Sequence, residues 1–220
     1  MKKLVPCFSH RIMPLAFDVF QFWLGCTVAK RKLVMLHYLN QKRILEVGCG
    51  TGNIAVAFLS RDVNYTGLDI DGAAIDYAKI KLGGKGGFSF ICQELQNYSF
   101  ESDFDFIIFS GVLHHVDDAT ALGMLEFSCS ILSPEGVLLV SDPIEPGLND
   151  SYIVKLYRKY FERGKYMRDL DALSNLLARV RGLRVVHHQC HGLGPFPIFS
   201  RPTVSNFAVF LLKPVISCPI

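Results

Sequence analysis

Three glycines at alternate positions, Gly48, Gly50 and Gly52, directly follow the mostly apolar run Ile44–Val47. Glycine has no Cβ, so a backbone rich in it can turn sharply and approach a ligand closely. In α/β proteins, a strand that runs into such a loop and then into a helix places a nucleotide-like ligand at the strand's carboxyl end. The strongest chemical signal in the sequence therefore predicts a cofactor site at residues 48–52.

The spacing of these glycines separates two classes of cofactor. In the dinucleotide fingerprint G-x-G-x-x-G, the third glycine lies three positions after the second and leaves room for a pyrophosphate at a helix N-terminus. Here Asn53 occupies that position, and the spacing is G-x-G-x-G. Glu46, two residues before the first glycine, would repel a pyrophosphate but suits a ligand with positive charge. An NAD-linked oxidoreductase is therefore the less favoured enzyme class.

The loop and four later segments resemble the motifs of the class I S-adenosylmethionine-dependent methyltransferases. In chain order, the matching segments are Glu46–Gly52 (E-V-G-C-G-T-G), Gly67–Asp71 (G-L-D-I-D), Ile91–Leu95 (I-C-Q-E-L), Ser110–Val116 (S-G-V-L-H-H-V) and Ser133–Val140 (S-P-E-G-V-L-L-V). The resemblance covers residues 40–142 with specific motifs. The stretch Arg163–Arg168 (R-G-K-Y-M-R) extends it to a subgroup of small bacterial methyltransferases with unassigned acceptors.

The resemblance implies S-adenosylmethionine as the cofactor. No metal site is expected, because the cysteines and histidines lack the spacing of a zinc site. The resemblance places Asp69 at the ribose hydroxyls, Glu94 at the adenine amino group and the segment from Ser110 beside the methionine end. The predicted cofactor-binding residues are Glu46, Gly48, Cys49, Gly50, Gly52, Asn53, Asp69, Ile70, Glu94, Leu95 and Ser110. Asp69 and Glu94 could instead end strands or cap helices, but their joint spacing after the glycine loop favours the cofactor.

Methyl transfer from a sulfonium is an in-line displacement on carbon by an already activated donor. Proximity and orientation supply most of the rate, and a general base is needed only when the acceptor must lose a proton. His114, His115 and Asp142 are the candidate catalytic residues. A histidine can equally cap or pack a loop, and Asp142 can simply begin the turn at Pro143. A non-catalytic cofactor-binding or interaction protein of the same fold is the alternative function.

Apolar β-rich runs alternate with helical stretches from residue 43 onward. The predicted strands are 43–48, 63–69, 88–93, 104–111 and 136–142, followed by 183–188 and 207–212, and the predicted helices are 54–59, 73–82, 119–132, 152–161 and 170–180. This alternation predicts an α/β fold with helices on both faces of a mostly parallel sheet. With the resemblance, we expect a Rossmann-like, doubly wound sheet of seven strands with an antiparallel last strand.

A single domain is expected, because 220 residues with 50% hydrophobic and 20% charged side chains suit one large core. Its predicted parts are an N-terminal helical cover (1–40), a cofactor-binding core (41–142), a helical acceptor-side insertion (143–182) and the last two strands (183–220). The cover is mostly apolar between Pro14 and Leu39. It is either a docking helix or a lid that faces a substrate or a membrane.

The net charge of +3 hides an uneven distribution. Residues 44–150 carry a net −12, whereas residues 1–43 carry +7 and residues 151–184 carry +6. The acidic middle suits a cationic cofactor, and the basic flanks suit an anionic acceptor. The predicted acceptor-binding residues are Arg158, Arg163 and Arg168. The expected acceptor is a small molecule or a lipid-linked precursor that is anionic or hydrophobic.

Several segments are unusually apolar or amphipathic for connecting segments. They are Phe17, Phe20, Phe22, Trp23, Gly194–Phe199 and the amphipathic stretch Tyr152–Phe161. The four aromatic residues and Gly194–Phe199 predict an apolar acceptor pocket, or they pack against the sheet. Tyr152–Phe161 is either a solvated surface helix or a helix whose basic face meets an anionic substrate or lipid headgroup, which leaves peripheral membrane contact open. Nucleic acid is not expected as a partner, because no N-P-P-Y-type motif follows the fourth strand and aromatic platforms are few.

The seven cysteines form no C-x-x-C pair and no zinc spacing, which favours a reducing compartment. The apolar stretch after the basic start Met1–Lys3 is cut short by Pro6, so it is too short for a signal peptide. Asp18 and Gln21 interrupt the next apolar region, which falls short of the roughly 20 apolar residues of a spanning helix. We therefore expect a cytoplasmic protein.

Overall fold

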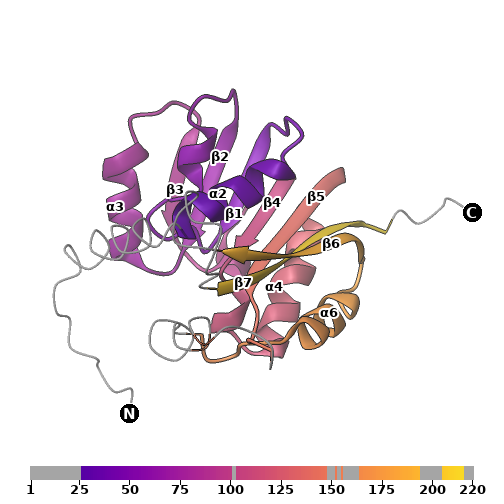
Figure 1. The fold of residues 1–220 in the computed structure, drawn as a ribbon. Helices are drawn as coiled ribbons and strands as arrows, with labels where there is room; N and C mark the ends of the chain where they lie inside the picture. The colour runs from indigo at the N-terminus through magenta and orange to yellow at the C-terminus, as the bar shows by residue number, and fades with distance from the viewer. Residues whose placement is uncertain are drawn as a thin grey trace, which may run out of the picture.

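The computed structural model describes residues 26–100, 103–147, 164–193 and 205–215, together with residues 152 and 155. Its centre is a seven-stranded sheet in the order β3-β2-β1-β4-β5-β7-β6 (Figure 1). The strands are β1 (Arg43–Val47), β2 (Asn64–Asp69), β3 (Phe88–Cys92), β4 (Phe104–Ser110), β5 (Leu132–Pro143), β6 (Leu183–Leu193) and β7 (Ser205–Pro214). Strands β1 to β5 pair in parallel, and β7 is antiparallel to both β5 and β6. The predicted α/β sheet is confirmed.

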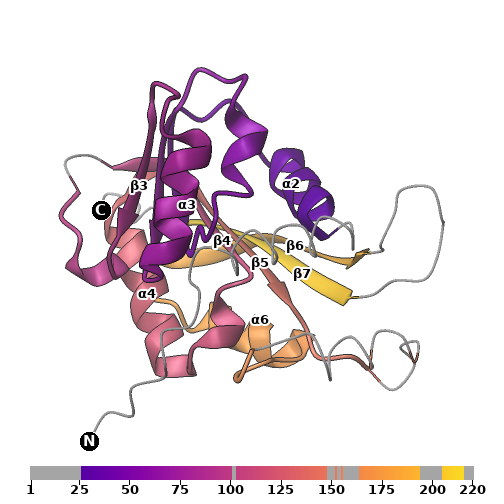
Figure 2. The same cartoon turned by 90° about the vertical axis from the view of Figure 1, so that its left-hand side faces the viewer.

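Helices cover both faces of this sheet. The α-helices are α2 (Cys26–Leu36), α3 (Gly72–Leu82), α4 (Asp118–Ser130) and α6 (Leu170–Ala178), and the short 3-10 helices are η1 (Ala55–Phe58), η2 (Leu95–Asn97) and η3 (Leu113–His115). Figure 2 shows α2 and α3 on one face and α4 and α6 on the other. The N-cap residues Asp71, Asp117 and Asp169 each accept a hydrogen bond from a first-turn amide, which fixes where α3, α4 and α6 begin.

The α-helix predicted at Ile54–Leu59 is wrong in type. The structure forms turns and the 3-10 helix η1 there, and no side chain caps the start of η1. In a 3-10 helix, residues three apart lie on the same side. Ala55 and Phe58 are therefore buried together, each with no exposed surface. Burial of these two side chains against the sheet decides the geometry of this connection.

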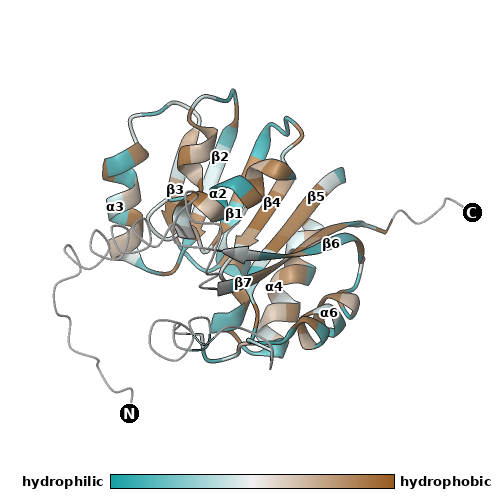
Figure 3. Cartoon of the chain, viewed as in Figure 1, coloured by the Kyte–Doolittle hydropathy of each residue, from teal (hydrophilic) through white to brown (hydrophobic). Residues whose placement is uncertain are grey.

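The core has two halves, one on each face of the central strands. Leu45, Ile107 and Leu138 pack toward α4 and α6, whereas Ile44 and Phe106 pack toward α2 and α3, and none of the five is exposed. In Figure 3, β4 and β5 are brown along most of their length. A parallel sheet covered on both faces needs such near-continuous apolar strands. Packing in this core holds the central strands in place, and the candidate site is built at their carboxyl ends.

The parallel strands end together at one edge of the sheet. β1, β2, β4 and β5 finish at Val47, Asp69, Ser110 and Pro143. The chain order reverses at β1, which has β2 on one side and β4 on the other. In open α/β sheets a reversal of this kind leaves a crevice at the carboxyl ends of the strands, where ligands bind. The glycine loop after β1 lies at this position.

No described helix is both long and apolar enough to span a membrane.

Candidate functional site

The glycine loop turns away from β1 through backbone angles that favour glycine. Gly48, Gly50 and Gly52 have φ values of 71°, 50° and 70°. A Cβ on Gly48 would lie 2.6 Å from a methyl carbon of Val112, so a side chain there would push the segment after β4 away. A Cβ on Gly50 would meet no atom within 4 Å. The loop therefore packs closely on one side and is open on the other.

Asp69 lies beside the open side of this loop. Its Oδ2 accepts a hydrogen bond from the amide of Gly50 at 2.7 Å, and its Oδ1 accepts one from the amide of Asp71 at 2.9 Å. The two amides fix the orientation of the carboxylate at the end of β2. Each carboxylate oxygen can accept a further hydrogen bond, and Asp69 is half-buried rather than enclosed. The group is suited to bind a pair of neighbouring hydroxyls.

The end of the neighbouring strand β3 contributes the other predicted contacts. The amide of Gln93 donates to the carbonyl of Asp69 at 3.0 Å, which holds the residues after β2 and β3 together. Ile70 is 74% exposed, and the exposed Glu94 accepts a hydrogen bond from the Asn97 amide group at 3.1 Å. Leu95 is buried, so it supports η2 from beneath. An exposed apolar side chain beside two carboxylates suits a flat, nitrogen-rich ring.

Ser110 ends β4 on the other side of β1. Its hydroxyl is buried and has no hydrogen-bond partner among the described residues. Buried polar groups in folded proteins are normally hydrogen-bonded. An orphaned hydroxyl at the ligand-binding edge of the sheet indicates a polar ligand group nearby. Together with the open face at Gly50 and the Asp69 carboxylate, it shows that the residues present fit a nucleoside ligand with a polar tail.

Cys49 and Asn53 have roles within the loop. Cys49 is buried, and burial raises the pKa of its thiol well above the usual value, so it is not a nucleophile at neutral pH. The backbone carbonyl of Asn53 accepts a hydrogen bond from Arg31 Nε at 2.6 Å, and its side-chain oxygen accepts one from Lys81 at 3.1 Å. Asn53 thus ties the end of the loop to α2 and α3.

Glu46 is a buried acid beneath the loop. The Tyr65 hydroxyl donates a hydrogen bond to Glu46 Oε2. Burial, with a smaller contribution from the charge of Asp69, raises the pKa of Glu46 to about 8, although the Tyr65 hydrogen bond and Lys30 act in the opposite direction. At neutral pH the carboxyl group is therefore mostly protonated. A cationic ligand bound nearby would favour its ionised form.

The raised pKa of Glu46 makes the stability depend on pH. The folded state holds this proton more tightly than the unfolded state, so the stabilisation is complete below pH 4.5 and is lost as pH rises through 8. Between pH 6 and 8 the free energy of unfolding should fall by about 2–3 kcal/mol more in the wild type than in Glu46→Gln, which cannot titrate. Urea unfolding of both proteins at these two pH values measures the difference, and equal slopes would contradict the buried acid.

Asp142 organises the segment after β4. Its Oδ1 accepts hydrogen bonds from the amides of Val112 at 2.9 Å and Leu113 at 3.2 Å, and it lies 3.1 Å from His114 Nδ1. Asp142 and His114 are only 3% and 4% exposed. The carboxylate therefore caps η3 and orients the imidazole, rather than only beginning the turn at Pro143.

The structure distinguishes the two histidines. A Cβ at Gly164 would lie 2.2 Å from Cδ2 of His114, so glycine is required where residue 164 packs on the imidazole. The His115 ring lies 4.0 Å from that of His114, centroid to centroid, but His115 is exposed. His114 is thus the member of the pair that the surrounding residues hold in place.

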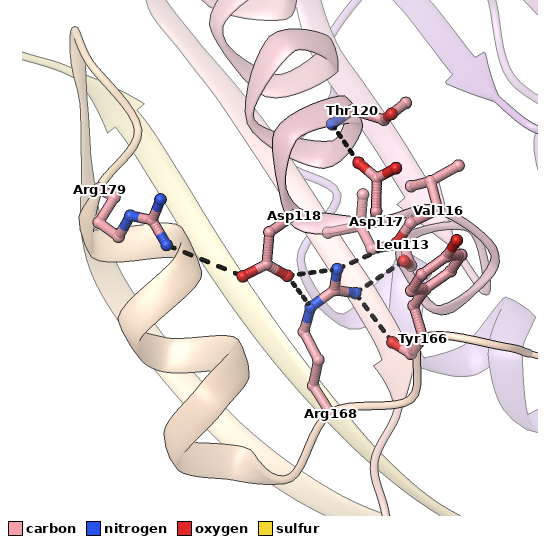
Figure 4. Close-up of polar contacts among 8 residues, drawn as sticks. All are labelled: Leu113, Val116, Asp117, Asp118, Thr120, Tyr166, Arg168 and Arg179. Atoms are coloured by element: carbon pink, nitrogen blue, oxygen red, sulfur yellow. Dashed lines mark hydrogen bonds and ion pairs between the residues drawn. The ribbon is translucent and has the colours of Figure 1, made fainter.

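Arg168 does not have the predicted acceptor-binding role. Figure 4 shows its guanidinium between Asp118 and the backbone of η3. Nε and Nη2 bind Asp118 Oδ1 at 2.9 and 2.7 Å. Nη1 donates to the carbonyls of Leu113 and Tyr166, and Nη2 donates to that of Val116. These contacts use all five N–H donors of the side chain, which leaves none for an acceptor. Arg168 clamps the carbonyl end of η3 just as Asp142 clamps its amide end.

Other predicted acceptor contacts lie outside the described residues. These are Arg158, Arg163, Phe17, Phe20, Phe22, Trp23 and Gly194–Phe199. Among the residues that the structure covers, no group of three or more His, Cys, Asp or Glu side chains could hold a metal ion.

Lys30 and Arg31 were not predicted as site residues. In the sequence they only interrupt an apolar run, but in the structure α2 brings them to the carboxyl edge of the sheet. Arg31 binds the loop at Asn53, and Lys30 Nζ lies 5.3 Å from the centroid of the Phe207 ring. The sequence does not show this position, because β4 and β7 are far from α2 along the chain. The one available signal is that Lys30 and Arg31 are spaced so as to share a helix side with the apolar Val34.

Comparisons with known proteins agree with this geometry. The family model described as "Methyltransferase domain" matches residues 26–188. Malonyl-[acyl-carrier protein] O-methyltransferase 1 of Ilyobacter polytropus is 38% identical over 85 residues, which are 38% of this chain and 32% of the relative. The ubiquinone biosynthesis O-methyltransferase of Bradyrhizobium sp. is 26% identical over 133 residues, or 60% of this chain and 51% of the relative. The chain thus spans about a third to a half of these relatives.

Solved structures share the fold. The mitomycin 7-O-methyltransferase MmcR superimposes with a TM-score of 0.68 at 19% identity, covering 91% of this chain and 58% of MmcR. The glycopeptide N-methyltransferase MtfA, in complex with S-adenosylmethionine, superimposes with a TM-score of 0.64 at 14% identity over 86% of this chain and 87% of MtfA.

Proposed function

Because the chain belongs to the class I S-adenosylmethionine-dependent methyltransferases, we propose that it transfers the cofactor's methyl group to an oxygen atom of a small organic acceptor. The observation that carries the proposal is the carboxyl edge of the sheet. Along that edge lie the Asp69 carboxylate at the end of β2, the open face of Gly50 after β1, and the Ser110 hydroxyl at the end of β4, which has no hydrogen-bond partner among the described residues. An oxygen acceptor is supported by the O-methyltransferase names of the curated relatives.

The chain's own residues would bind and orient the cofactor. Asp69 would accept hydrogen bonds from the ribose hydroxyls, Ile70 would pack on the adenine ring, and Glu94 would accept from the adenine amino group. Ser110 and the backbone of Gly48–Gly52 would face the methionine end. The bound cofactor supplies a methyl group on a positively charged sulfur, so the protein's contribution to the rate is mainly orientation.

His114 is the proposed general base for a hydroxyl acceptor. The Asp142 carboxylate favours the tautomer that carries its hydrogen on Nδ1, which makes Nε2 the basic nitrogen. The same carboxylate would stabilise the imidazolium that forms when the acceptor proton is taken. Asp142 acts through His114 and is therefore a positioning residue in this proposal.

Arg158 and Arg163 remain proposed contacts for an anionic acceptor, which includes a lipid-linked precursor. Cys49, Cys92, Cys129 and Cys190 are free thiols. They support a reducing, cytoplasmic setting for this reaction.

A transfer assay tests the proposal. Purified protein is incubated with methyl-labelled S-adenosylmethionine and separate sets of phenols, alcohols and carboxylates, and the labelled products are identified by mass. We expect a methyl ether or methyl ester. His114→Asn should lower kcat by roughly 10²–10⁴-fold and leave S-adenosylhomocysteine affinity within twofold, whereas His115→Asn is the matched control and should change kcat little.

Two results would contradict the proposal. Label found only on nitrogen or sulfur acceptors would exclude the oxygen assignment. Cofactor binding without any transfer to a broad acceptor set would favour the non-catalytic alternative. An unchanged kcat in His114→Asn would contradict the role of His114 as general base, but it would not contradict methyl transfer by this protein.

A further inference from the structure

Residues 164–168, here called the strap, lie in the chain between β5 and α6 and follow the backbone of η3. The amide of Tyr166 donates a hydrogen bond to the His114 carbonyl at 2.9 Å. Arg168 Nη1 donates to the carbonyl of Leu113 at 2.7 Å. Figure 4 shows Tyr166 and Arg168 beside Leu113. The strap therefore lies directly against the segment that carries the proposed base.

The strap is fastened to other parts of the fold as well. Arg168 and Ile144 form a parallel bridge, and the amide of Glu145 donates to the carbonyl of Arg168 at 2.9 Å. The guanidinium of Arg168 also binds Asp118 at the start of α4. Moving the strap away from η3 would break these hydrogen bonds together, and buried groups that lose their partners are costly. Side chains that contact the strap must therefore fit its position.

Gly164 brings the strap into contact with the His114 ring. A Cβ at residue 164 would lie 2.2 Å from Cδ2 and 3.0 Å from Cγ of His114, and 2.9 Å from its carbonyl oxygen. On the other edge of the ring, Nδ1 lies 3.1 Å from Asp142 Oδ1. Cδ2 and Nδ1 are the two ring atoms bonded to Cγ, so contacts at both restrict rotation about the Cβ–Cγ bond, a torsion that is otherwise broad for histidine. Asp142 and Gly164 together therefore set the direction of Nε2.

We propose that Gly164 is a positioning residue for methyl transfer, because its close contact with the imidazole fixes the direction in which Nε2 meets the acceptor hydroxyl. This inference rests on the proposed function, in which His114 is the general base. A base must lie within hydrogen-bond reach of the proton that it takes. The preceding residue, Arg163, is a proposed contact for an anionic acceptor. Adjacent residues of one segment would then set the position of the acceptor and the angle of the base.

Gly164→Ala tests this role in catalysis. The added methyl group must displace the imidazole, since the strap is fastened in place. With the acceptor that the transfer assay identifies, kcat should fall roughly 100-fold, as expected for a reacting group misplaced by about 1 Å. The KM for that acceptor and the Kd for S-adenosylhomocysteine should stay within about twofold. Gly84→Ala is the matched control and should change none of these values, because a Cβ at Gly84 would meet no atom within 4 Å.

Nuclear magnetic resonance of the histidine rings gives a readout that needs no acceptor. In protein with isotope-labelled histidine, the wild-type His114 ring should show one tautomer, with its hydrogen on Nδ1. Loss of the signal in His114→Asn assigns it. In Gly164→Ala the hydrogen bond to Asp142 should weaken, and both tautomers should appear. A structural change elsewhere in the protein would leave this signal as it is.

Thermal unfolding covers the case in which Gly164→Ala folds poorly. His114→Ala removes the ring atoms that a Cβ at residue 164 would meet. Gly164→Ala should therefore lower the thermal midpoint by less in the His114→Ala background than in the wild type. Equal losses in both backgrounds would place the clash elsewhere and overturn the proposal.

Two other results would overturn the proposal. One is an unchanged kcat or an unchanged His114 signal in Gly164→Ala. The other is an equal loss of kcat and of S-adenosylhomocysteine affinity, which would indicate a distorted cofactor site. An unchanged kcat in His114→Asn would instead contradict the proposed base, and a wild-type protein without methyl transfer would contradict the proposed function itself.

Discussion

Arg168→Met should lower the free energy of unfolding by about 3 kcal/mol. Methionine keeps an unbranched apolar stem of similar shape, but it removes the donors that serve the carbonyls of Leu113, Val116 and Tyr166. Removing one member of a buried ion pair usually costs 3–5 kcal/mol. We take the lower end because the partner, Asp118, is 57% exposed. At this chain length, the thermal midpoint should fall by about 6–12 °C.

The matched control is Arg181→Met. Arg181 also makes a two-pronged ion pair, with Glu126, but its side chain is 86% exposed. Exposed pairs of this kind contribute little to stability, because water and salt screen them. Urea unfolding of both variants measures the contrast. A stable Arg168→Met protein with a raised KM for its acceptor would restore the acceptor-binding role and contradict the clamp.

The sequence predicts those features of the molecule that depend on residues close together along the chain. The glycine loop, the strand before it and Asp69 lie within 30 residues of one another, and their spacing alone places them at one edge of a parallel sheet. The alternation of apolar strands and helices likewise predicted the order of the elements, because both faces of a parallel sheet must be covered.

The parts that the sequence could not predict depend on contacts between distant residues. Arg168 reaches Asp118 and the η3 carbonyls from 50 or more residues away, so its basic character in sequence suggested a ligand contact and not a buried clamp. The sequence does not distinguish an acceptor role of Asp142 from a turn role, because its η3 amide partners lie 29 and 30 residues earlier. The 3-10 geometry at Ala55–Phe58 follows from burial against the sheet, which local helix patterns do not reveal.

Asp69→Asn should weaken S-adenosylhomocysteine binding about 100-fold. A carboxylate can accept both ribose hydroxyls at full charge, whereas an asparagine amide offers one accepting oxygen and one donating nitrogen. Losing hydrogen bonds to a charged group costs about 1.5–3 kcal/mol, which is roughly 10–100-fold for each hydroxyl. The amide oxygen can still accept from the Gly50 amide, which lies 2.7 Å from Oδ2, so the contact with the glycine loop should be kept. The hydrogen bond from the Asp71 amide to Oδ1 is lost.

Asp76→Asn serves as the control for Asp69→Asn. Asp76 is an exposed acid on α3, seven residues along the chain, and Asp76→Asn removes the same charge as Asp69→Asn. It should bind S-adenosylhomocysteine like the wild type. Equal affinities for Asp69→Asn and wild type would show that the ribose does not contact this carboxylate.

Calorimetric titration of the wild-type protein with S-adenosylhomocysteine and with NAD tests the central claim most directly. The glycine spacing, the buried Glu46 and the carboxylate of Asp69 predict binding of one S-adenosylhomocysteine per chain and none of NAD. At a hundredfold excess over its Kd, the bound ligand should also stabilise the fold by about 2.7 kcal/mol. Binding of NAD without S-adenosylhomocysteine, or of neither, would contradict the assignment of this edge of the sheet as a methyl-donor site.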